Sequence, residues 1–496
     1  MPAAQAHSRT LLAERTLLGV AAVLFVVLTR YHWQQIADDA FIVFRVADHV
    51  VGGWGPVWNR GERVEAYSSP LWLGLAVVLR LAGEPLPAGA GAVGVFCSAL
   101  CLLAAWQLAL VASSSRVVAA AACLAATLVY PLYFWAPAGL ETALVAALVT
   151  WAAAALLGSS TWQWCLSAGL LGIARPEGPL LALALVGLAA LVRGRPAMRW
   201  SSVAMALAPA VAWLLFRRSY YGVWLPNPYY AKATGAFAAR IESGVLYCSS
   251  VLAFGAVTAV AVWLGGIHRK LGAVLLLAAL LVAIVVGGGG DWMWHGRLLV
   301  PAMLLLVPLA ASAVARLSGP RRIAAAVACI VAGSGLLPSP SLLADACAAR
   351  RMPPTAYQEG TMVPAALSAA SYIASNYPAD ALIAVNHAGA LPYALPNPVL
   401  DMTGLADAHI ARELSGSLHQ KFDARYVLSR QPRVIVLNTR VRPGTAGSWY
   451  QPGYWAGETA LVNQPDFATN YRPVEAFWTW RWQPVGESYI VLYERK

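Results

Sequence analysis

Long apolar runs recur through the first two thirds of the chain, from Thr16 to about Pro338, and they limit the possible folds more than any other feature. A helix needs roughly 20 apolar residues to cross a hydrocarbon core about 30 Å thick. The chain is 59% hydrophobic and only 12% charged, about half the charge of an ordinary soluble protein. These features predict a polytopic helical membrane protein, which is a mainly α fold.

We predict eleven membrane spans with boundaries that are soft by several residues. They are 11–30, 66–83, 88–112, 116–136, 139–158, 162–192, 199–217, 244–266, 270–289, 294–316 and 321–338. This count takes 162–192 as one crossing, although Arg175-Pro176-Glu177 lies midway along it. Charge is costly there and proline interrupts helical hydrogen bonds, so this run is either a broken helix lining a cavity or two shorter segments.

Basic residues in the short loops predict the orientation, because lysine and arginine concentrate on the cytoplasmic side of membrane proteins. With the amino terminus inside, the basic clusters around Arg193, Arg269 and Arg321 also fall inside. The loops 31–65, 218–243 and 287–293 then fall outside, together with everything after residue 339. Orientation in a bilayer accounts for the net charge of +12, so we expect membrane lipids and no nucleic acid as partners.

The composition changes after Pro338, where prolines, asparagines and tryptophans replace the leucine and alanine runs. We therefore predict a transmembrane domain over 1–338, with an outer loop at 31–68, and a soluble extracytoplasmic α/β domain over 339–496. In the second domain the patterns predict a helix at 361–376 and strands at 381–385, 434–437 and 489–493. Its only cysteine is Cys347, so no disulfide framework is available there.

The outer loop concentrates polar residues in a chain that has few of them, beginning with the adjacent carboxylates Asp38 and Asp39. If residues 38–52 form a helix, Asp38, Arg45 and His49 share one face. We expect this helix to lie flat at the membrane interface with its polar stripe toward a cavity. A plain alternative is that one carboxylate caps the helix and Arg45 binds lipid phosphate. Even then, the second carboxylate stays available as a base or cation ligand.

Two stretches of this loop resemble a known family. Asp38-Asp39-Ala40-Phe41-Ile42-Val43-Phe44-Arg45 and the run from Gly53 to Trp72 look like the start of the membrane arabinofuranosyltransferases of the GT-C class, a family that includes mycobacterial and pseudomonad enzymes. Further motifs follow in the order typical of this group: Gly139-Leu140-Glu141, Arg175-Pro176-Glu177, Leu225-Pro226-Asn227, Gly288-Gly289-Gly290-Asp291 and His295-Gly296-Arg297. The resemblance covers roughly residues 30–310.

The resemblance implies a GT-C-like glycosyltransferase on the outer face of the bacterial inner membrane. Such an enzyme moves a sugar, here arabinofuranose, from a polyprenyl-phosphate donor to a cell-envelope glycan or surface-protein acceptor. Asp38 or Asp39 would take the proton of the acceptor hydroxyl, which is typically worth about 10² to 10⁴ in rate. Cations would stabilise the leaving phosphate, and we predict Arg45, Lys232, His295 and Arg297 for this role. For the sugar or acceptor we predict Trp58, Glu62, Arg63, Glu65, Glu141 and Asp291.

Three questions stay open at the level of sequence. Paired acids admit Mg²⁺ or Mn²⁺, but a lipid monophosphate donor does not require a metal, and the residues His387, Asp401, Asp407 and His409 match no tight ligand spacing. A transporter or flippase for lipid-linked sugars is the alternative function, favoured only by Arg175 and Glu177 within a predicted span. The sugar, the acceptor and the anomeric outcome are not encoded in any motif that we identify.

Overall fold

The computed structural model describes residues 2–33, 35–158, 160–194, 199–232, 236–266, 269–291, 293, 295–334, 354–416, 420–439, 456–482 and 486–496. The chain forms two compact units. The first comprises 1–34, 91–215 and 237–343, and the second comprises 35–90, 216–236 and 344–496. The carboxy-terminal region is therefore grouped with the outer loop and with a short middle segment. Residue 338, the predicted boundary, lies outside the described residues.

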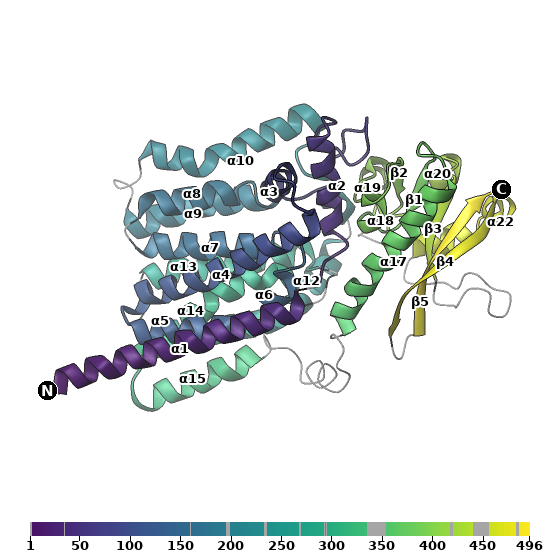
Figure 1. Cartoon of the computed structure of the whole chain (residues 1–496). Coiled ribbons are helices and arrows are strands. Elements are labelled where there is room, and N and C mark those ends of the chain that lie inside the picture. Colours follow the sequence, from purple (N-terminus) through teal and green to yellow (C-terminus); the bar gives the residue numbers. More distant parts are fainter. Residues whose placement is uncertain are drawn as a thin grey trace. The chain divides into compact units, whose positions relative to one another are not determined.

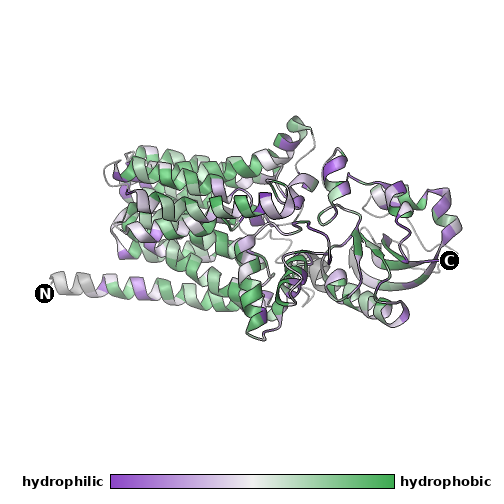
Figure 2. Ribbon diagram, turned by 90° about the horizontal axis from the view of Figure 1, so that it is seen from above, coloured by the Kyte–Doolittle hydropathy of each residue, from purple (hydrophilic) through white to green (hydrophobic). Residues whose placement is uncertain are grey.

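Helices of alternating direction build the first unit (Figure 1). They are α1 (Pro2–His32), α4 (Leu86–Ser113), α5 (Arg116–Thr127), α6 (Tyr130–Trp135), α7 (Thr142–Leu157), α8 (Thr161–Leu171), α9 (Gly178–Arg193), α10 (Trp200–Tyr221), α12 (Phe237–Leu264), α13 (Arg269–Gly288), η2 (Arg297–Leu299), α14 (Val300–Arg316) and α15 (Gly319–Gly333). Figure 2, coloured by residue hydropathy, shows that these helices consist largely of hydrophobic residues. Within the described ranges, six helices are long and apolar enough to cross a membrane, as a multi-pass membrane protein requires.

Two predicted spans differ from the structure. The run 162–192 forms two helices, α8 and α9, because Pro176 and the charged residues beside it lie in the turn between them. Arg193 at the end of α9 donates to the Thr161 hydroxyl at 2.9 Å, so the two ends of the run lie side by side. The predicted span 66–83 contains only the 12-residue helix α3 (Pro70–Leu81), which belongs to the second unit.

Fewer helices reach membrane-spanning length than the eleven predicted spans. Within the described residues six qualify by length and composition, and they include α1, α4, α10, α12, α13 and α14, so the count of eleven stays a prediction. The end of α1 and the start of α4 lie at the same end of the unit: the His32 ring contacts the Tyr130 ring at 5.5 Å, and Gly91 adjoins the Pro137 carbonyl. Residues 33–85 therefore make no net crossing.

Basic side chains gather at the opposite end of the first unit, where they bind the last carbonyls of neighbouring helices. Arg193 donates to the Gly158 carbonyl at 3.0 Å and Lys270 donates to the Leu157 carbonyl at 3.0 Å. Arg316 donates to the Ala112 carbonyl at 2.6 Å. Cations stabilise helix C-termini, which carry partial negative charge. The shared side predicted for these basic residues agrees with this arrangement; Arg195 and His268 lie outside the described residues.

A mixed five-stranded sheet forms the centre of the second unit, in the order β2-β1-β3-β5-β4. β2 (Val399–Asp401), β1 (Ile383–Val385) and β3 (Val434–Thr439) are parallel, whereas β5 (Gly486–Arg495) pairs antiparallel with β3 and with β4 (Tyr471–Trp482). The helices are α2 (Ala40–Val51), α3, α11 (Asn227–Lys232), α17 (Pro354–Asn376), α18 (Ala390–Tyr393), α19 (Ala408–Glu413), α20 (Ala424–Ser429), α21 (Ala456–Val462) and α22 (Pro465–Asn470). The predicted α/β region is confirmed, while β2 and β4 were not predicted.

Helix α2 lies inside the second unit. Nine of its twelve residues are buried, including Phe44 and Val46 at 0% exposure. The helix packs against α3 and α18, and the Phe41 ring contacts the Tyr393 ring at 5.3 Å. The predicted helix is confirmed, and its apolar residues are covered by protein. Its placement flat at a membrane interface stays a prediction.

Candidate active site

The two adjacent carboxylates occupy different surroundings. Asp38 is 7% exposed, and its Oδ1 accepts a hydrogen bond from the backbone N–H of Ala390 at 2.8 Å, at the start of α18. Burial raises the Asp38 pKa to about 7, and the nearby charge of Asp39 adds to this increase. A Cβ atom on Gly389 would overlap the Asp38 backbone and carboxylate, so the two segments meet without spare room. Asp38 therefore helps to hold the fold.

Asp39 differs in burial. It is the N-cap residue of α2 and is half-buried, whereas Asp38 is 7% exposed. Because an acceptor reaches a more exposed side chain more easily, Asp39 is the better candidate of the predicted pair for a group that meets an acceptor. The sequence did not indicate the Ala390 contact, because a backbone N–H carries no sequence signature.

Arg45 is 4% exposed and spreads its donors over backbone carbonyls. Its Nε donates to the Trp58 carbonyl at 2.8 Å, Nη1 to Leu395 at 2.9 Å and to Pro392, and Nη2 to Asn397 at 2.9 Å. Burial lowers the Arg45 pKa to about 10, and the nearby charge of Arg60 adds to the decrease. These bonds favour a role in joining the outer loop to the segment 392–397 over the predicted contact with donor phosphate.

Two residues predicted to bind sugar or acceptor are enclosed instead. Glu65 has a side chain with 0% exposure, and it pairs with Arg217 at 2.5 Å between Oε2 and Nε. The Trp58 side chain is 1% exposed and lies under the Arg45 guanidinium. Their burial favours roles in the fold over direct contact with a sugar ring, and the predicted sugar or acceptor role stays untested for both residues.

Glu62 and Arg63 remain on the surface. Glu62 Oε2 accepts a hydrogen bond from Asn59 Nδ2 at 3.0 Å, and the Arg63 guanidinium lies 4.9 Å from the centre of the Tyr220 ring. Both are exposed, as an acceptor-binding role requires. That role stays a prediction for these two residues.

Asn227 connects the middle segment of the second unit to the loop that follows β2. Its Nδ2 donates to the carbonyls of Gly404, Leu405 and Asp407 at 2.9 to 3.1 Å. Asp401 shapes this loop, because its carboxylate accepts from the Thr403 and Ala406 backbone N–H groups at 2.9 and 2.7 Å. The motifs around Asn227 and Asp401 are far apart in the sequence, but they are joined here by hydrogen bonds.

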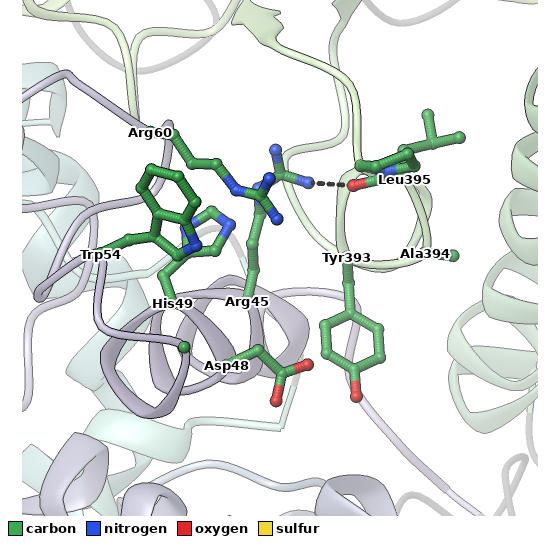
Figure 3. Close-up of a pocket in the computed structure, with 10 residues that line it drawn as sticks. Arg45, Asp48, His49, Trp54, Arg60, Tyr393, Ala394 and Leu395 are labelled. Carbon is green, nitrogen blue, oxygen red and sulfur yellow. Dashed lines mark hydrogen bonds between the residues drawn. The ribbon is translucent and has the colours of Figure 1, made fainter. Parts of the chain in front are cut away.

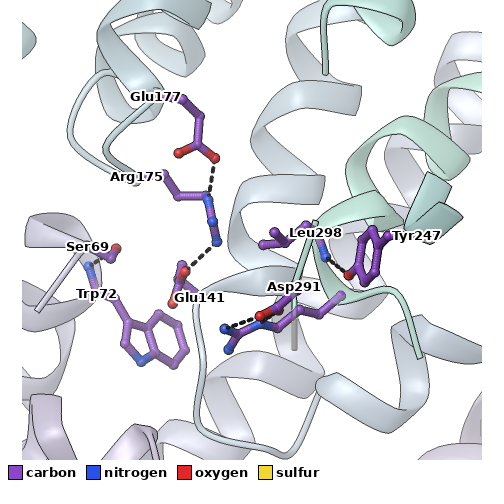
Figure 4. Close-up of polar contacts among 9 residues, drawn as sticks. Ser69, Trp72, Glu141, Arg175, Glu177, Tyr247, Asp291 and Leu298 are labelled. Carbon is purple, nitrogen blue, oxygen red and sulfur yellow. Dashed lines mark hydrogen bonds and ion pairs between the residues drawn. The ribbon is translucent and has the colours of Figure 1, made fainter. Parts of the chain in front are cut away.

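A second cluster of charge lies in the first unit. Arg175 is placed between two carboxylates, with Nη1 2.7 Å from Glu141 and Nε 2.5 Å from Glu177 (Figure 4). Arg297 forms an ion pair with Asp291 and lies 5.7 Å from the centre of the Trp135 ring. All of these charged residues occupy helix ends or the turns between helices. Of the two alternatives for the run 162–192, two shorter segments is confirmed, with Arg175 and Glu177 in the turn between them.

The remaining predicted cations differ in charge and placement. His295 contacts the rings of Phe134 and Tyr130 at 4.4 and 5.1 Å, and burial, together with His32, lowers its pKa to about 4. A neutral imidazole can bind a phosphate by hydrogen bonding but adds no charge. Lys232 is half-buried at the last residue of α11. The neighbouring Trp292 and Trp294 lie outside the described residues.

The residues that the structure describes include no group of three or more histidine, cysteine, aspartate or glutamate side chains arranged to hold a metal ion. In the acidic pair, the Ala390 N–H already points at Asp38 Oδ1, which disfavours a cation there. His409 bonds to Glu413 at 2.8 Å and Asp423 at 3.1 Å. The possible Mg²⁺ or Mn²⁺ at Asp38 and Asp39 stays a prediction.

The chain is similar in sequence to one described protein family and to two named bacterial proteins. A family model described as a domain of unknown function (DUF8728) matches residues 355–493. The chain is homologous to the terminal beta-(1->2)-arabinofuranosyltransferase of Mycobacterium tuberculosis, with 33% identity over 244 residues, which are 44% of this chain and 38% of that protein. The protein of the same name from Corynebacterium glutamicum is 41% identical over 56 residues, or 11% of this chain and 8% of its own length. The matched stretch thus spans about two fifths of the first relative.

A solved structure covers more of the chain at lower identity. The crystal structure of ArnT from Cupriavidus metallidurans bound to undecaprenyl phosphate superimposes with a TM-score of 0.54 and 14% identity. The superposition covers 96% of this chain and 97% of ArnT. This likeness shows the fold, which is of the GT-C class.

Proposed function

We propose that the protein is a membrane glycosyltransferase that moves a sugar, arabinofuranose, from a polyprenyl-phosphate donor to a hydroxyl of a cell-envelope glycan or surface protein. The observation that carries this proposal is the homology with arabinofuranosyltransferases over 244 residues. The GT-C fold supports it, since ArnT, which has the same fold, was solved with undecaprenyl phosphate.

In the proposed reaction Asp39 acts as the general base. Its carboxylate takes the proton of the acceptor hydroxyl while the hydroxyl oxygen attacks the anomeric carbon of the donor sugar. The bond between that carbon and the phosphate oxygen breaks, and the lipid phosphate leaves with the electron pair. Proton removal by a positioned carboxylate contributes about 10² to 10⁴ in rate. Asp38 would help to orient Asp39, because the hydrogen bond from Ala390 fixes Asp38, its neighbour in the chain, against the start of α18.

Arg297 is the residue that we propose for the donor phosphate. Its guanidinium already pairs with Asp291, and a phosphate can replace or share that partner through two parallel hydrogen bonds. The stacking on Trp135 would hold the side chain in place when the partner changes. Lys232 and His295 are weaker candidates. A lysine side chain has a long, flexible stem and offers only a point charge. The His295 imidazole is neutral at pH 7 because its pKa is lowered to about 4.

The bacterial inner membrane is the proposed location, with the segments of the second unit outside. Basic side chains mark one end of the first unit, and the positive-inside rule assigns that end to the cytoplasm. The outer loop departs and returns at the other end. Labelling of a cysteine introduced at position 60 or 420 from the outside is expected; labelling from the cytoplasm alone would reverse the orientation.

A transporter or flippase is the second function considered from sequence, and the structure removes its main support. Transporters place ionisable residues near the middle of their spans. Arg175 and Glu177, which suggested this, lie in the turn between α8 and α9. Arg175 forms ion pairs with Glu177 and with Glu141, and this suits a cluster of charged residues at one end of the helices.

The proposal is tested with purified protein in detergent and a radiolabelled decaprenyl-phosphate arabinofuranose donor. Release of lipid phosphate with transfer to an arabinan oligosaccharide is expected, and turnover without a sealed membrane excludes pure transport. Asp39→Asn should lower kcat about 100-fold or more because the amide cannot accept the proton. Asp466→Asn, an exposed carboxylate in α22, is the matched control. Full activity of Asp39→Asn would exclude Asp39 as the base.

A further inference from the structure

A cavity of about 290 Å³ opens beside the second half of α2, and the residues that line it lie in the second unit. Arg45, His49 and Trp54 come from α2 and the turn after it, and Arg60 comes from the following loop (Figure 3). Tyr393 and the segment 394–396 form the facing wall. This volume is close to the lower end of small-molecule pockets, which is roughly 300 Å³.

The side chains that line this cavity carry more positive than negative charge. Asp48 lines the cavity, but its Oδ1 is 2.8 Å from Arg80 Nε, so Arg80 balances the negative charge of Asp48. Arg45 is buried and bonded to carbonyl groups, which solvate a cation without cancelling its charge. Arg60 lies close enough to oppose the charge of Arg45. Two guanidinium groups therefore face one cavity, an arrangement that an anion would stabilise.

The uncharged lining suits a sugar. Trp54 is 53% exposed and lies under the Arg60 guanidinium at 4.8 Å, so one face of the indole is covered and the ring is held in place. His49 Nδ1 is 2.9 Å from the Val57 carbonyl and must donate to it. In neutral imidazole this leaves Nε2 as a hydrogen-bond acceptor for a hydroxyl. Aromatic rings and such acceptors are the usual contacts for saccharide rings.

The cavity is separate from the proposed base. Asp38 and Asp39 do not line it. Along α2, position 39 and position 49 are about 15 Å apart, given a rise of 1.5 Å per residue. A ligand in the cavity would therefore leave Asp39 uncovered.

We propose that this cavity is a second binding site, for a saccharide that carries a phosphate group. The oxyanion would bind the Arg60 guanidinium, and the buried charge of Arg45 would add attraction while Arg45 keeps its carbonyl partners. The sugar ring would lie against Trp54 with a hydroxyl on His49. The phosphate can belong to a soluble glycan or to a lipid headgroup, and the shared chemistry is a phosphate ester within reach of Arg60. This site is additional to the donor site proposed above and does not depend on the transfer reaction.

Isothermal titration of the full chain in neutral detergent with glucose 1-phosphate tests the proposal. Saturable binding is expected, with glucose alone binding at least tenfold more weakly because it lacks the oxyanion. Arg60→Gln should weaken binding about tenfold, and Trp54→Ala should weaken it less. Arg430→Gln is the matched control, since Arg430 is an exposed arginine beside the Tyr426 ring at 6.0 Å, outside the cavity. It should leave binding unchanged.

Two further arms separate the alternatives. In nanodiscs, competition of glucose 1-phosphate by phosphatidylglycerol but not by phosphatidylcholine would identify a lipid headgroup as the source of the phosphate, and its absence would identify a soluble ligand. Arg297→Gln should leave binding unchanged. Binding that is lost in Arg297→Gln and retained in Arg60→Gln would place the ligand at the donor site and overturn the proposal, as would equal binding of glucose.

Discussion

The Asp38 carboxylate accepts a hydrogen bond from the backbone N–H of Ala390, a residue 352 positions further along the chain. The contact joins the outer loop to the carboxy-terminal region at the start of α18. Gly389, which precedes Ala390, packs closely against Asp38: a Cβ atom on Gly389 would overlap the Asp38 backbone and carboxylate. The proposed pair of catalytic carboxylates therefore adjoins a close contact at Gly389.

Gly389→Ala should destabilise the second unit. The added Cβ would overlap the Asp38 carbonyl and carboxylate, and such overlap in a packed region typically costs about 1 to 3 kcal/mol. We expect a lower apparent Tm in detergent and a loss of transfer activity. Gly74→Ala, in α3 of the same unit, is the control because a Cβ there meets no atom within 4 Å. Equal Tm values for the two variants would contradict the close contact.

The buried ion pair between Glu65 and Arg217 gives a second prediction. Arg217→Ala leaves the Glu65 carboxylate buried without its partner, which typically costs about 3 to 5 kcal/mol. A lower Tm and reduced expression are expected. Arg218→Ala, the exposed neighbour in α10, should behave like the wild type. The double change Glu65→Gln with Arg217→Met should recover part of the loss; no recovery would mean that the pair acts through packing alone.

Arg297→Lys should raise the KM for the lipid donor about tenfold and leave the KM for the acceptor nearly unchanged. A lysine offers a point charge in place of the two parallel donors that Arg297 provides. The measurement is initial rate with donor and acceptor varied separately. Arg116→Lys, an arginine 4.0 Å from Glu14 in the same unit, serves as the control. A rise in the acceptor KM alone would assign Arg297 to the acceptor.

Glu458 predicts a pH dependence of stability in the carboxy-terminal region. Burial raises its pKa from 4.5 to about 8, although Asn438 and Asn386 donate hydrogen bonds to it. The folded state holds this proton more tightly than the unfolded state, so its stabilising effect is complete below about pH 4.5 and is lost as the pH rises to 8.

Glu458→Gln should therefore reduce the fall in Tm between pH 5 and pH 8, because the amide keeps the acceptor oxygen but cannot ionise. Thermal unfolding across this pH range measures the effect. Glu475→Gln, a partly exposed residue of β4, should retain the wild-type slope. Parallel curves for Glu458→Gln and the wild type would show that the carboxyl is already ionised in the folded protein.

Much of the fold follows from local pattern, and the exceptions follow from contacts across the chain. Apolar runs of 20 residues identify α1, α4, α12 and α13, because length and hydropathy alone define a membrane helix. The sequence alone does not distinguish a kink from a hairpin at Arg175, since a charged Pro-containing stretch suits both. The strand β2 has only three residues, too few for a period of two to be recognised.

The candidate site was predicted only in part. A role for Asp38 and Asp39 was predicted from their adjacency, but the contact of Asp38 with Ala390 was not, because that partner is a backbone group. Glu65 and Arg45 looked exposed in a polar loop, and the structure encloses them with Arg217 and with three carbonyls of the segment 392–397. Long-range partners of this kind leave no periodic signal in a sequence.

The carbonyls of Pro392, Leu395 and Asn397 are bound by an arginine that comes 347 to 352 residues earlier. A fragment that begins after residue 353 would lack Arg45, Asp38 and Asn59, and these buried acceptors and donors would lose their partners. Exchange of the carboxy-terminal region between related proteins would meet the same obstacle. A chimera should retain its fold only if the outer loop 35–90 and the segment 216–236 are transplanted together with it, so these three pieces should change in concert during evolution.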